Sequence, residues 1–174
     1  LRDGNRVSYS KPGTHFFGEA VNETPGERVR RVQKAFDQAG IAYETPEDMI
    51  RIMWWKFMVN VGMNQASAVM GAPYGVFQVS PEARAVMESL MREVIALARP
   101  AGVNLAEKDL DEWDKVLRTL SPDGKTSMLQ DMEAGRKTEV EVFGGKVVSL
   151  SKRYNIPAPV NETFLRIIQV MENR

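Results

Sequence analysis

The chain has 174 residues, enough for one domain with a hydrophobic core and a fragment of another. Hydrophobic residues make up 43% and charged residues 26%, the composition of an ordinary globular protein. The 23 basic and 23 acidic side chains cancel, so charge gives no reason to expect a nucleic acid or an anionic membrane as partner. The absence of cysteine excludes disulfides, thiol catalysis and zinc–thiolate sites, and we expect a cytoplasmic protein. No apolar run is long enough to span a membrane, because polar residues interrupt the longest ones.

The first 22 residues differ from the rest of the chain. The runs Arg6–Ser10 and His15–Ala20 contain β-forming residues, and the Pro-Gly pair between them is a turn signal, so we predict a hairpin. A two-stranded hairpin is marginally stable by itself, and no further strand is predicted in the sequence. The chain also lacks an initial Met. We therefore expect residues 1–22 to be remnant strands of a larger sheet.

Residues 23–174 are predicted to be helical throughout, so the fold class is mainly α with a short N-terminal β remnant. Capping residues and Pro mark the helix starts, and Gly marks most of the stops. One of the helices is expected to be loosened at Gly144-Gly145. The predicted helices are, in chain order, residues 24–40, 45–70, 80–102, 105–120, 127–135, 138–154 and 159–172.

The most informative segment lies in the second predicted helix. With about 100° per residue, Asn60 lies about 40° and Asn64 about 80° from Lys56, so the three side chains form one narrow polar stripe. The rest of the helix is apolar, which is typical of a buried helix. A polar stripe on a buried helix must face a cavity, a cleft or a partner, because unpaired polar groups are costly to bury. The alternative is an amphipathic helix whose polar side chains face solvent, and the pattern alone does not decide between the two.

Two further residues are candidates for binding a ligand. Ser127 stands at a predicted helix start, where backbone N–H groups favour an anion such as a carboxylate, although the simpler interpretation is that its hydroxyl only caps the helix, in a capping box with Gln130. Glu139 lies near the start of the next helix, and a solvated surface position is the default for such a residue. The sequence contains no metal-ligand cluster, nucleophile motif or glycine-rich phosphate loop, so no metal site is predicted.

Four motifs follow one another along the chain: Lys56-x-x-x-Asn60-x-x-x-Asn64, Ser127-Met-x-Gln-Asp131, Gly135-Arg136-x-Thr-Glu139 and Asn155-Ile-Pro-x-Pro-x-Asn161. Taken in this order, they resemble the C-terminal domain of the ketopantoate reductases, and the resemblance covers about residues 1–172. It implies a multi-helix substrate-binding domain of the 6-phosphogluconate-dehydrogenase-like type over residues 23–174, preceded by strands of a truncated Rossmann domain over residues 1–22.

The family reduces 2-dehydropantoate to pantoate with NADPH, on the route to pantothenate and coenzyme A. The resemblance implies that Lys56 is the catalytic general acid that protonates the ketone oxygen, and that Glu139 is a second catalytic residue, which contacts substrate and orients the lysine. It also implies that Asn60, Asn64 and Ser127 bind the substrate. Because no G-x-G-x-x-G occurs in the chain, NADPH would be bound mainly by a missing N-terminal domain, the cofactor-binding residues are unknown, and this chain alone should be inactive.

Two departures from the family pattern leave the substrate open. The chain has Gly144-Gly145 where the family often has Asn-Gly, and Glu139-Val-Glu141 where Glu-Ile-Asp is usual. One alternative is therefore a reductase of a different 2-oxo acid with the same architecture. Another is a non-catalytic helical module for interaction or dimerisation. The expected partner is a small 2-oxo acid, and homodimerisation through the helical domain is left open.

Overall fold

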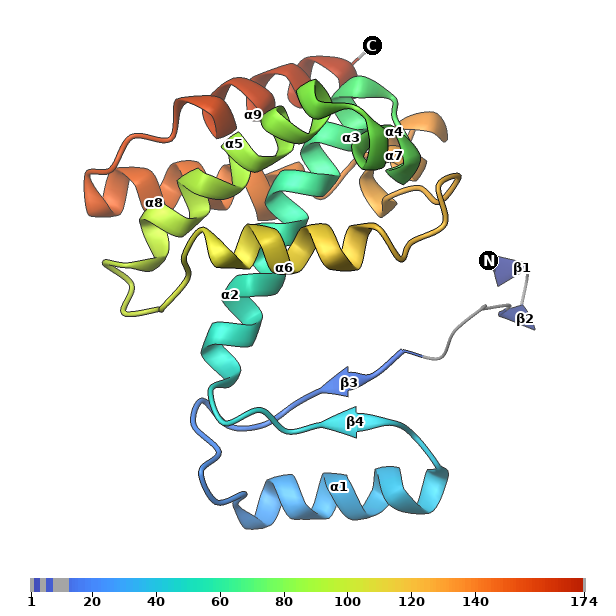
Figure 1. The fold of residues 1–174 in the computed structure, drawn as a ribbon, viewed down its shortest axis with the longest axis vertical. Coiled ribbons are helices and arrows are strands. Elements are labelled where there is room, and N and C mark those ends of the chain that lie inside the picture. Colours follow the sequence, from blue (N-terminus) through green and yellow to red (C-terminus); the bar gives the residue numbers. More distant parts are fainter. Residues whose placement is uncertain (1, 4–5, 8–12, 174) are drawn as a thin grey trace. The chain divides into compact units, whose positions relative to one another are not determined.

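The structure is a computed structural model that describes residues 2–3, 6–7 and 13–173, and the chain divides into two compact units, residues 1–53 and 54–174. In the first unit, β1 pairs antiparallel with β2, and β3 pairs in parallel with β4. The helix α1 connects β3 to β4 (Figure 1). The described elements of this unit are β1 (Arg2–Asp3), β2 (Arg6–Val7), β3 (His15–Phe16), α1 (Glu27–Ala39) and β4 (Tyr43–Glu44).

The predicted hairpin between residues 6–10 and 15–20 is wrong. His15 pairs with Tyr43 on β4, and β2 pairs with β1 instead. Residues 8–12, which include most of the predicted turn, lie outside the described residues. The prediction failed because α1 carries the chain back along the sheet, which makes the next strand parallel to β3. The two-residue strand β4 was not predicted, because it lies in the short gap between two predicted helices.

The helix α1 begins and ends on glycines. Gly26 is its N-cap without a side-chain cap, so the helix predicted to start at Thr24 begins later and without a capping side chain. Gly40 ends the helix as predicted, with a left-handed φ of 64° that a residue without a Cβ adopts at little cost. The ring of Phe36 on this helix packs edge-on against Phe17, with 5.2 Å between the ring centroids. Aromatic contacts of this kind attach α1 to the strands.

The second unit is made of helices, as predicted for this part of the chain. A continuous helical run from Met49 to Met70 contains α2, a π-helical turn η1 and α3, and a second π turn, η2, precedes α8. The described elements are α2 (Met49–Val59), η1 (Asn60–Asn64), α3 (Gln65–Met70), α4 (Tyr74–Val79), α5 (Pro81–Ala98), α6 (Lys108–Leu117), α7 (Ser127–Glu133), η2 (Glu141–Gly145), α8 (Lys146–Tyr154) and α9 (Pro159–Glu172).

Most predicted helix ends agree with the structure to within a few residues. Ser80 caps α5 by accepting a hydrogen bond from the Ala83 N–H, as its position before Pro81 predicts. The second predicted helix starts later than expected, because the Asp48 carboxylate accepts from the Arg51 N–H and supplies the cap. The short helix α4 was not predicted and occupies part of the expected break. Among the described residues, no helix has both the length and the apolar character needed to cross a membrane.

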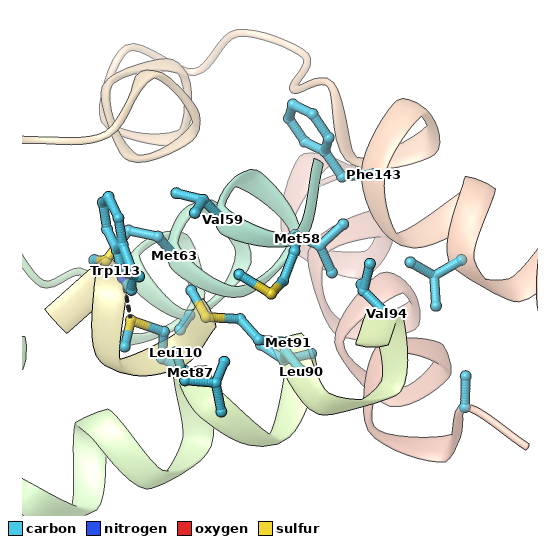
Figure 2. Close-up of a cluster of buried hydrophobic side chains, with 14 of the residues drawn as sticks. Met58, Val59, Met63, Met87, Leu90, Met91, Val94, Leu110, Trp113 and Phe143 are labelled. Carbon is cyan, nitrogen blue, oxygen red and sulfur yellow. Dashed lines mark hydrogen bonds between the residues drawn. The ribbon is translucent and has the colours of Figure 1, made fainter. Parts of the chain in front are cut away.

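The core of the second unit is built where α5 packs against η1. A Cβ added at Gly62 would lie 2.9 Å from the carbonyl oxygen of Met87 and would also overlap the Met91 side chain, so this helix crossing requires glycine. The indole N–H of Trp113 points at the Met87 sulfur at 3.4 Å. Figure 2 shows buried side chains of both segments and of the neighbouring α2 in one cluster, among them Met58, Met63, Met87, Leu90, Met91 and Val94.

Candidate functional site

The predicted polar stripe passes through a π turn. Lys56 lies on α2, Asn60 begins η1, and Asn64 ends it. In an α-helix a step of four residues overshoots a full turn by about 40°. A turn closed by i→i+5 bonds holds more than four residues, so the same step falls short of a full turn. The step from Lys56 to Asn60 therefore rotates past a full turn, while the step from Asn60 to Asn64 stops short of one. The two deviations largely cancel, so the π turn brings Asn64 back toward the direction of Lys56.

The three side chains of the stripe differ in burial. Lys56 is exposed, Asn60 is half-buried, and Asn64 retains only 8% of its exposure. Among the residues that the structure describes, none donates to or accepts from these three side chains. The stripe thus runs from the surface toward the interior, and it ends on a mostly buried asparagine whose amide has no hydrogen-bond partner in the described residues. The amide atoms of Asn64 are not fully enclosed and can bind water or a ligand, and the solvent-facing alternative describes Lys56 better than Asn64.

Ser127 does not cap its helix. The N-cap of α7 is Thr126, whose hydroxyl oxygen accepts from the Leu129 N–H at 3.1 Å, so the capping box predicted for Ser127 is wrong. Ser127 is instead the first helical residue, and its side chain is exposed. In the described part of the chain its hydroxyl has no hydrogen-bond partner. The simpler alternative for this residue, a hydroxyl used only as a cap, is thereby excluded.

Segments that are far apart in the sequence meet at the π turn. Both α7 and η2 pack against η1, and Glu139 lies two residues before η2. Glu139 is exposed, and its backbone carbonyl accepts from the Val142 N–H at 2.9 Å. The neighbouring Thr138 is fixed by Glu172, which accepts from its backbone N–H at 2.7 Å. The π turn of the stripe, the helix that begins with Ser127 and the π turn that follows Glu139 therefore form one neighbourhood.

Some charged side chains of this neighbourhood form ion pairs, and others do not. Asp131 forms an ion pair with Arg136 at 2.7 Å, and Glu133 forms one with Lys125 at 2.7 Å. Neither Lys56 nor Glu139 has an ion-pair partner within the described ranges, and no hydrogen bond joins one to the other. The structure thus brings η2, which follows Glu139, against η1, which follows Lys56, without the contact through which Glu139 would orient Lys56. The described residues contain no group of three or more His, Asp or Glu side chains able to hold a metal ion.

Sequence reasoning missed Gln65, which follows the π turn and has no exposed surface. Its Nε2 donates to the carbonyl oxygen of Val61 at 2.8 Å and to Asn161 Oδ1 at 2.9 Å. Asn161 was noted only as part of a motif. The available signal was a polar residue in an otherwise apolar stretch, Gln65-Ala-Ser-Ala-Val69, because such a residue needs a buried partner.

Comparison with known proteins identifies the family. The family model described as the C-terminal domain of ketopantoate reductase PanE/ApbA matches residues 48–172. A 2-dehydropantoate 2-reductase of Halobacterium salinarum is 31% identical over 146 residues, which cover 83% of this chain and 48% of the relative. The chain spans about half the length of the curated relatives that it matches first.

Solved structures agree with this result. A PanE/ApbA family ketopantoate reductase from Ralstonia eutropha JMP134 has a TM-score of 0.80 and 25% identity, with 95% of this chain and 53% of that chain covered. D-mandelate dehydrogenase, in a ternary structure with NADH and anilino(oxo)acetate, has a TM-score of 0.85 at 15% identity and covers 96% of this chain and 69% of its own. The latter likeness is one of fold alone. The chain belongs to the ketopantoate reductase family, and it contains that family's C-terminal domain.

Proposed function

We propose that the chain is the substrate-binding and proton-donating part of an NADPH-dependent reductase that converts 2-dehydropantoate to pantoate, in the biosynthesis of pantothenate and coenzyme A. Membership of the family supports the reaction type. The observation that carries the assignment to this site is Asn64, a mostly buried residue at the inner end of the stripe whose amide has no hydrogen-bond partner in the described residues. An amide that keeps access to solvent in such a position can exchange bound water for the polar groups of a ligand.

The substrate would lie along the stripe. Lys56 and Asn60 are about 6 Å apart along the helix axis, which suits groups on adjacent parts of a small branched oxo acid. Asn60 and Asn64 each offer an N–H donor and a carbonyl acceptor, so they can bind a hydroxyl group and a keto oxygen. Ser127, on the neighbouring helix, offers a hydroxyl donor for the carboxylate. These roles follow the family resemblance and are proposals for this chain.

Reduction of a ketone requires a hydride at carbon and a proton at oxygen. The proton would come from the Lys56 ammonium group, at the outer end of the stripe, as negative charge develops on the ketone oxygen. The same cation stabilises that charge electrostatically before the proton moves. Glu139, which has no ion-pair partner in the described ranges, would contact the substrate and orient Lys56 once the ligand is bound.

The described connection between a strand and a helix does not fit the phosphates of a nucleotide. The connection between β3 and α1 has the sequence Phe17-Gly-Glu-Ala-Val-Asn-Glu-Thr-Pro-Gly26, which lacks the closely spaced glycines that allow backbone to approach a pyrophosphate. NADPH would be the hydride donor, as in the family, and would be held by residues other than this connection. The chain supplies the proton, the substrate contacts and their geometry.

The proposal is tested by binding and by turnover. In an ¹⁵N-labelled sample of the chain, 2-dehydropantoate should shift the side-chain amide signals of Asn60 and Asn64 saturably, while those of the exposed loop residue Asn104 should stay in place. The full-length protein should oxidise NADPH in its presence. Turnover in the full-length protein without shifts at Asn60 and Asn64 would contradict the placement of the substrate.

A second candidate is a reductase of another 2-oxo acid. The two departures from the family pattern, Gly144-Gly145 and Glu139-Val-Glu141, favour this alternative because they leave the architecture unchanged while altering residues near the proposed site. A panel of branched and aromatic 2-oxo acids, assayed with NADPH and with NADH, separates the two candidates. Selective turnover of another acid would keep the mechanism and change the substrate, whereas no turnover of any acid would favour a helical interaction module.

A further inference from the structure

The π turn Asn60–Asn64 is held by the residue that follows it. In an α-helix the backbone N–H of residue 65 would donate to the carbonyl oxygen of residue 61. Here the Gln65 N–H donates to the Gly62 carbonyl, and the Gln65 side chain donates to the Val61 carbonyl at 2.8 Å. The side chain of Gln65 thus occupies the acceptor that an ordinary helical turn would use.

The amide of Gln65 is held by a second buried amide, Asn161 on α9. Gln65 Nε2 donates to Asn161 Oδ1 at 2.9 Å, and Asn161 Nδ2 donates to the Leu90 carbonyl at 3.1 Å and to Glu93 Oε2 at 2.7 Å. Both amides have no exposed surface. Their orientation is fixed, because reversing Gln65 would place its oxygen against two acceptors.

Glu93, on α5, closes this network at the first turn of α9. Its carboxylate oxygens accept from the backbone N–H groups of Val160 at 2.8 Å and Asn161 at 2.9 Å. A carboxylate is favoured there by the helix dipole and by the unpaired N–H groups of a helix start. One chain of hydrogen bonds therefore runs from α5 through α9 to the π turn.

The network is poorly suited to a purely stabilising role. Gln65 Oε1 is buried without a partner in the described part of the chain. It faces η2 at Gly144, where an added Cβ would lie 2.5 Å from it, so this position requires glycine. A buried amide with an unpaired oxygen contributes less stability than an apolar side chain of the same shape. What the amide does provide is a donor at the Val61 carbonyl.

We propose that Gln65, Asn161 and Glu93 are positioning residues of the substrate site. They hold residues 60–64 in the π turn and so keep Asn64 in line with Lys56. The inference rests on the proposed function for its kinetic readout, while its structural part concerns the chain without ligand.

The test replaces Gln65 by Met, which keeps the length of the side chain and removes both donors. In the ligand-free chain, the variant Gln65→Met should shift the side-chain amide signal of Asn64 and the backbone amide signals of residues 60–64. In the full-length protein, KM for the 2-oxo acid should rise between about tenfold and a hundredfold, since displacement of binding groups by an ångström has effects of this order. The turnover number should change less, because Lys56 lies outside the π turn.

The matched control is Gln78→Met. Gln78 also donates two hydrogen bonds to backbone carbonyls, those of Leu117 and Leu120, both at 2.9 Å, but it lies on α4. This variant should shift neither the side-chain amide signal of Asn64 nor the backbone amide signals of residues 60–64, and it should leave KM within about twofold of the wild type. If Gln65→Met does not fold, Glu93→Gln replaces it, because this variant keeps the size of the side chain and in either orientation places an NH₂ group against an N–H donor of Val160 or Asn161. It should change the same signals and raise KM in the same direction.

The outcomes separate the inference from the proposed function. If the full-length wild type reduces no 2-oxo acid, the proposed function fails, and the spectra of the ligand-free variants still decide whether the network holds the π turn. If the wild type reduces the acid and Gln65→Met or Glu93→Gln folds with unshifted signals for residues 60–64, the inference is overturned. A rise in KM that Gln78→Met reproduces would also overturn it, because the effect would then be one of general stability.

Discussion

The hydroxyl group of Thr126 donates a hydrogen bond to the hydroxyl oxygen of Ser67, 3.2 Å away, and both side chains are buried. Ser67 in turn donates to the Ala72 carbonyl at 2.7 Å, just beyond the end of α3. The Thr126 oxygen also caps α7 by accepting from the Leu129 N–H. The helix that begins with Ser127 is therefore tied by a side chain to the helix that continues from Asn64.

Thr126→Ala should destabilise the protein and weaken substrate binding. It removes a helix cap, which is worth about 1 kcal/mol, and it leaves the Ser67 hydroxyl without its donor. Urea unfolding measures the loss in free energy, and KM reports the displacement of Ser127. Thr126→Ser keeps the hydroxyl and should recover most of both effects. Equal stability of the two variants would show that the cap contributes nothing.

Lys56→Ala should lower turnover by at least roughly a hundredfold, the scale expected for removal of a general acid. Because Lys56 is exposed and makes no ion pair in the described ranges, the free energy of unfolding should change by less than about 0.5 kcal/mol. NADPH oxidation by the full-length protein and its thermal unfolding measure the two effects. Lys152→Ala, an exposed lysine on α8, is the control and should leave turnover unchanged. Near-normal turnover of Lys56→Ala would remove Lys56 from the mechanism.

Glu139→Gln should raise KM, lower turnover, and leave the fold intact. The side chain is exposed and unpaired in the described residues, so its loss costs little stability, whereas a neutral amide no longer attracts the Lys56 ammonium group. Steady-state kinetics separate the binding effect from the effect on turnover. Glu133→Gln is the control, since the Glu133 carboxylate is already engaged in an ion pair with Lys125. Unchanged kinetic constants in Glu139→Gln would count against the assignment.

Local signals predicted most of the helices in this chain. Ser80 before Pro81 marks the start of α5, Gly71 ends α3 with a left-handed φ of 60°, and Pro159 begins α9. Each signal acts through bonds within one helical turn, so it can be read from neighbouring residues. The strand pairing of β3 with Tyr43–Glu44 could not be read in this way, because it depends on where α1 places the chain.

The candidate site was predicted in outline but not in geometry. The spacing of Lys56, Asn60 and Asn64 places them on one face of any regular helix. The π turn could not be predicted from this spacing, because it involves Gln65 and a partner 96 residues further along the chain, Asn161. Periodicity contains no information on such a contact. The burial of Asn64 has the same origin, since α5, α7 and η2 pack against the turn that contains it.

Asn64→Leu should separate stability from binding. Asn64 is mostly buried and its amide has no partner in the described residues, so replacing it with an apolar side chain breaks no hydrogen bond and should leave the free energy of unfolding unchanged or raised. The same change should abolish the binding of the 2-oxo acid, because the inner end of the stripe loses its donor and acceptor. Asn161→Leu is the control: its amide is fully buried and paired, so its removal should cost about 2–4 kcal/mol. Unfolding in urea and titration with the acid give both quantities. If Asn64→Leu lost as much stability as Asn161→Leu, Asn64 would be a structural residue, and the substrate would have to be placed elsewhere.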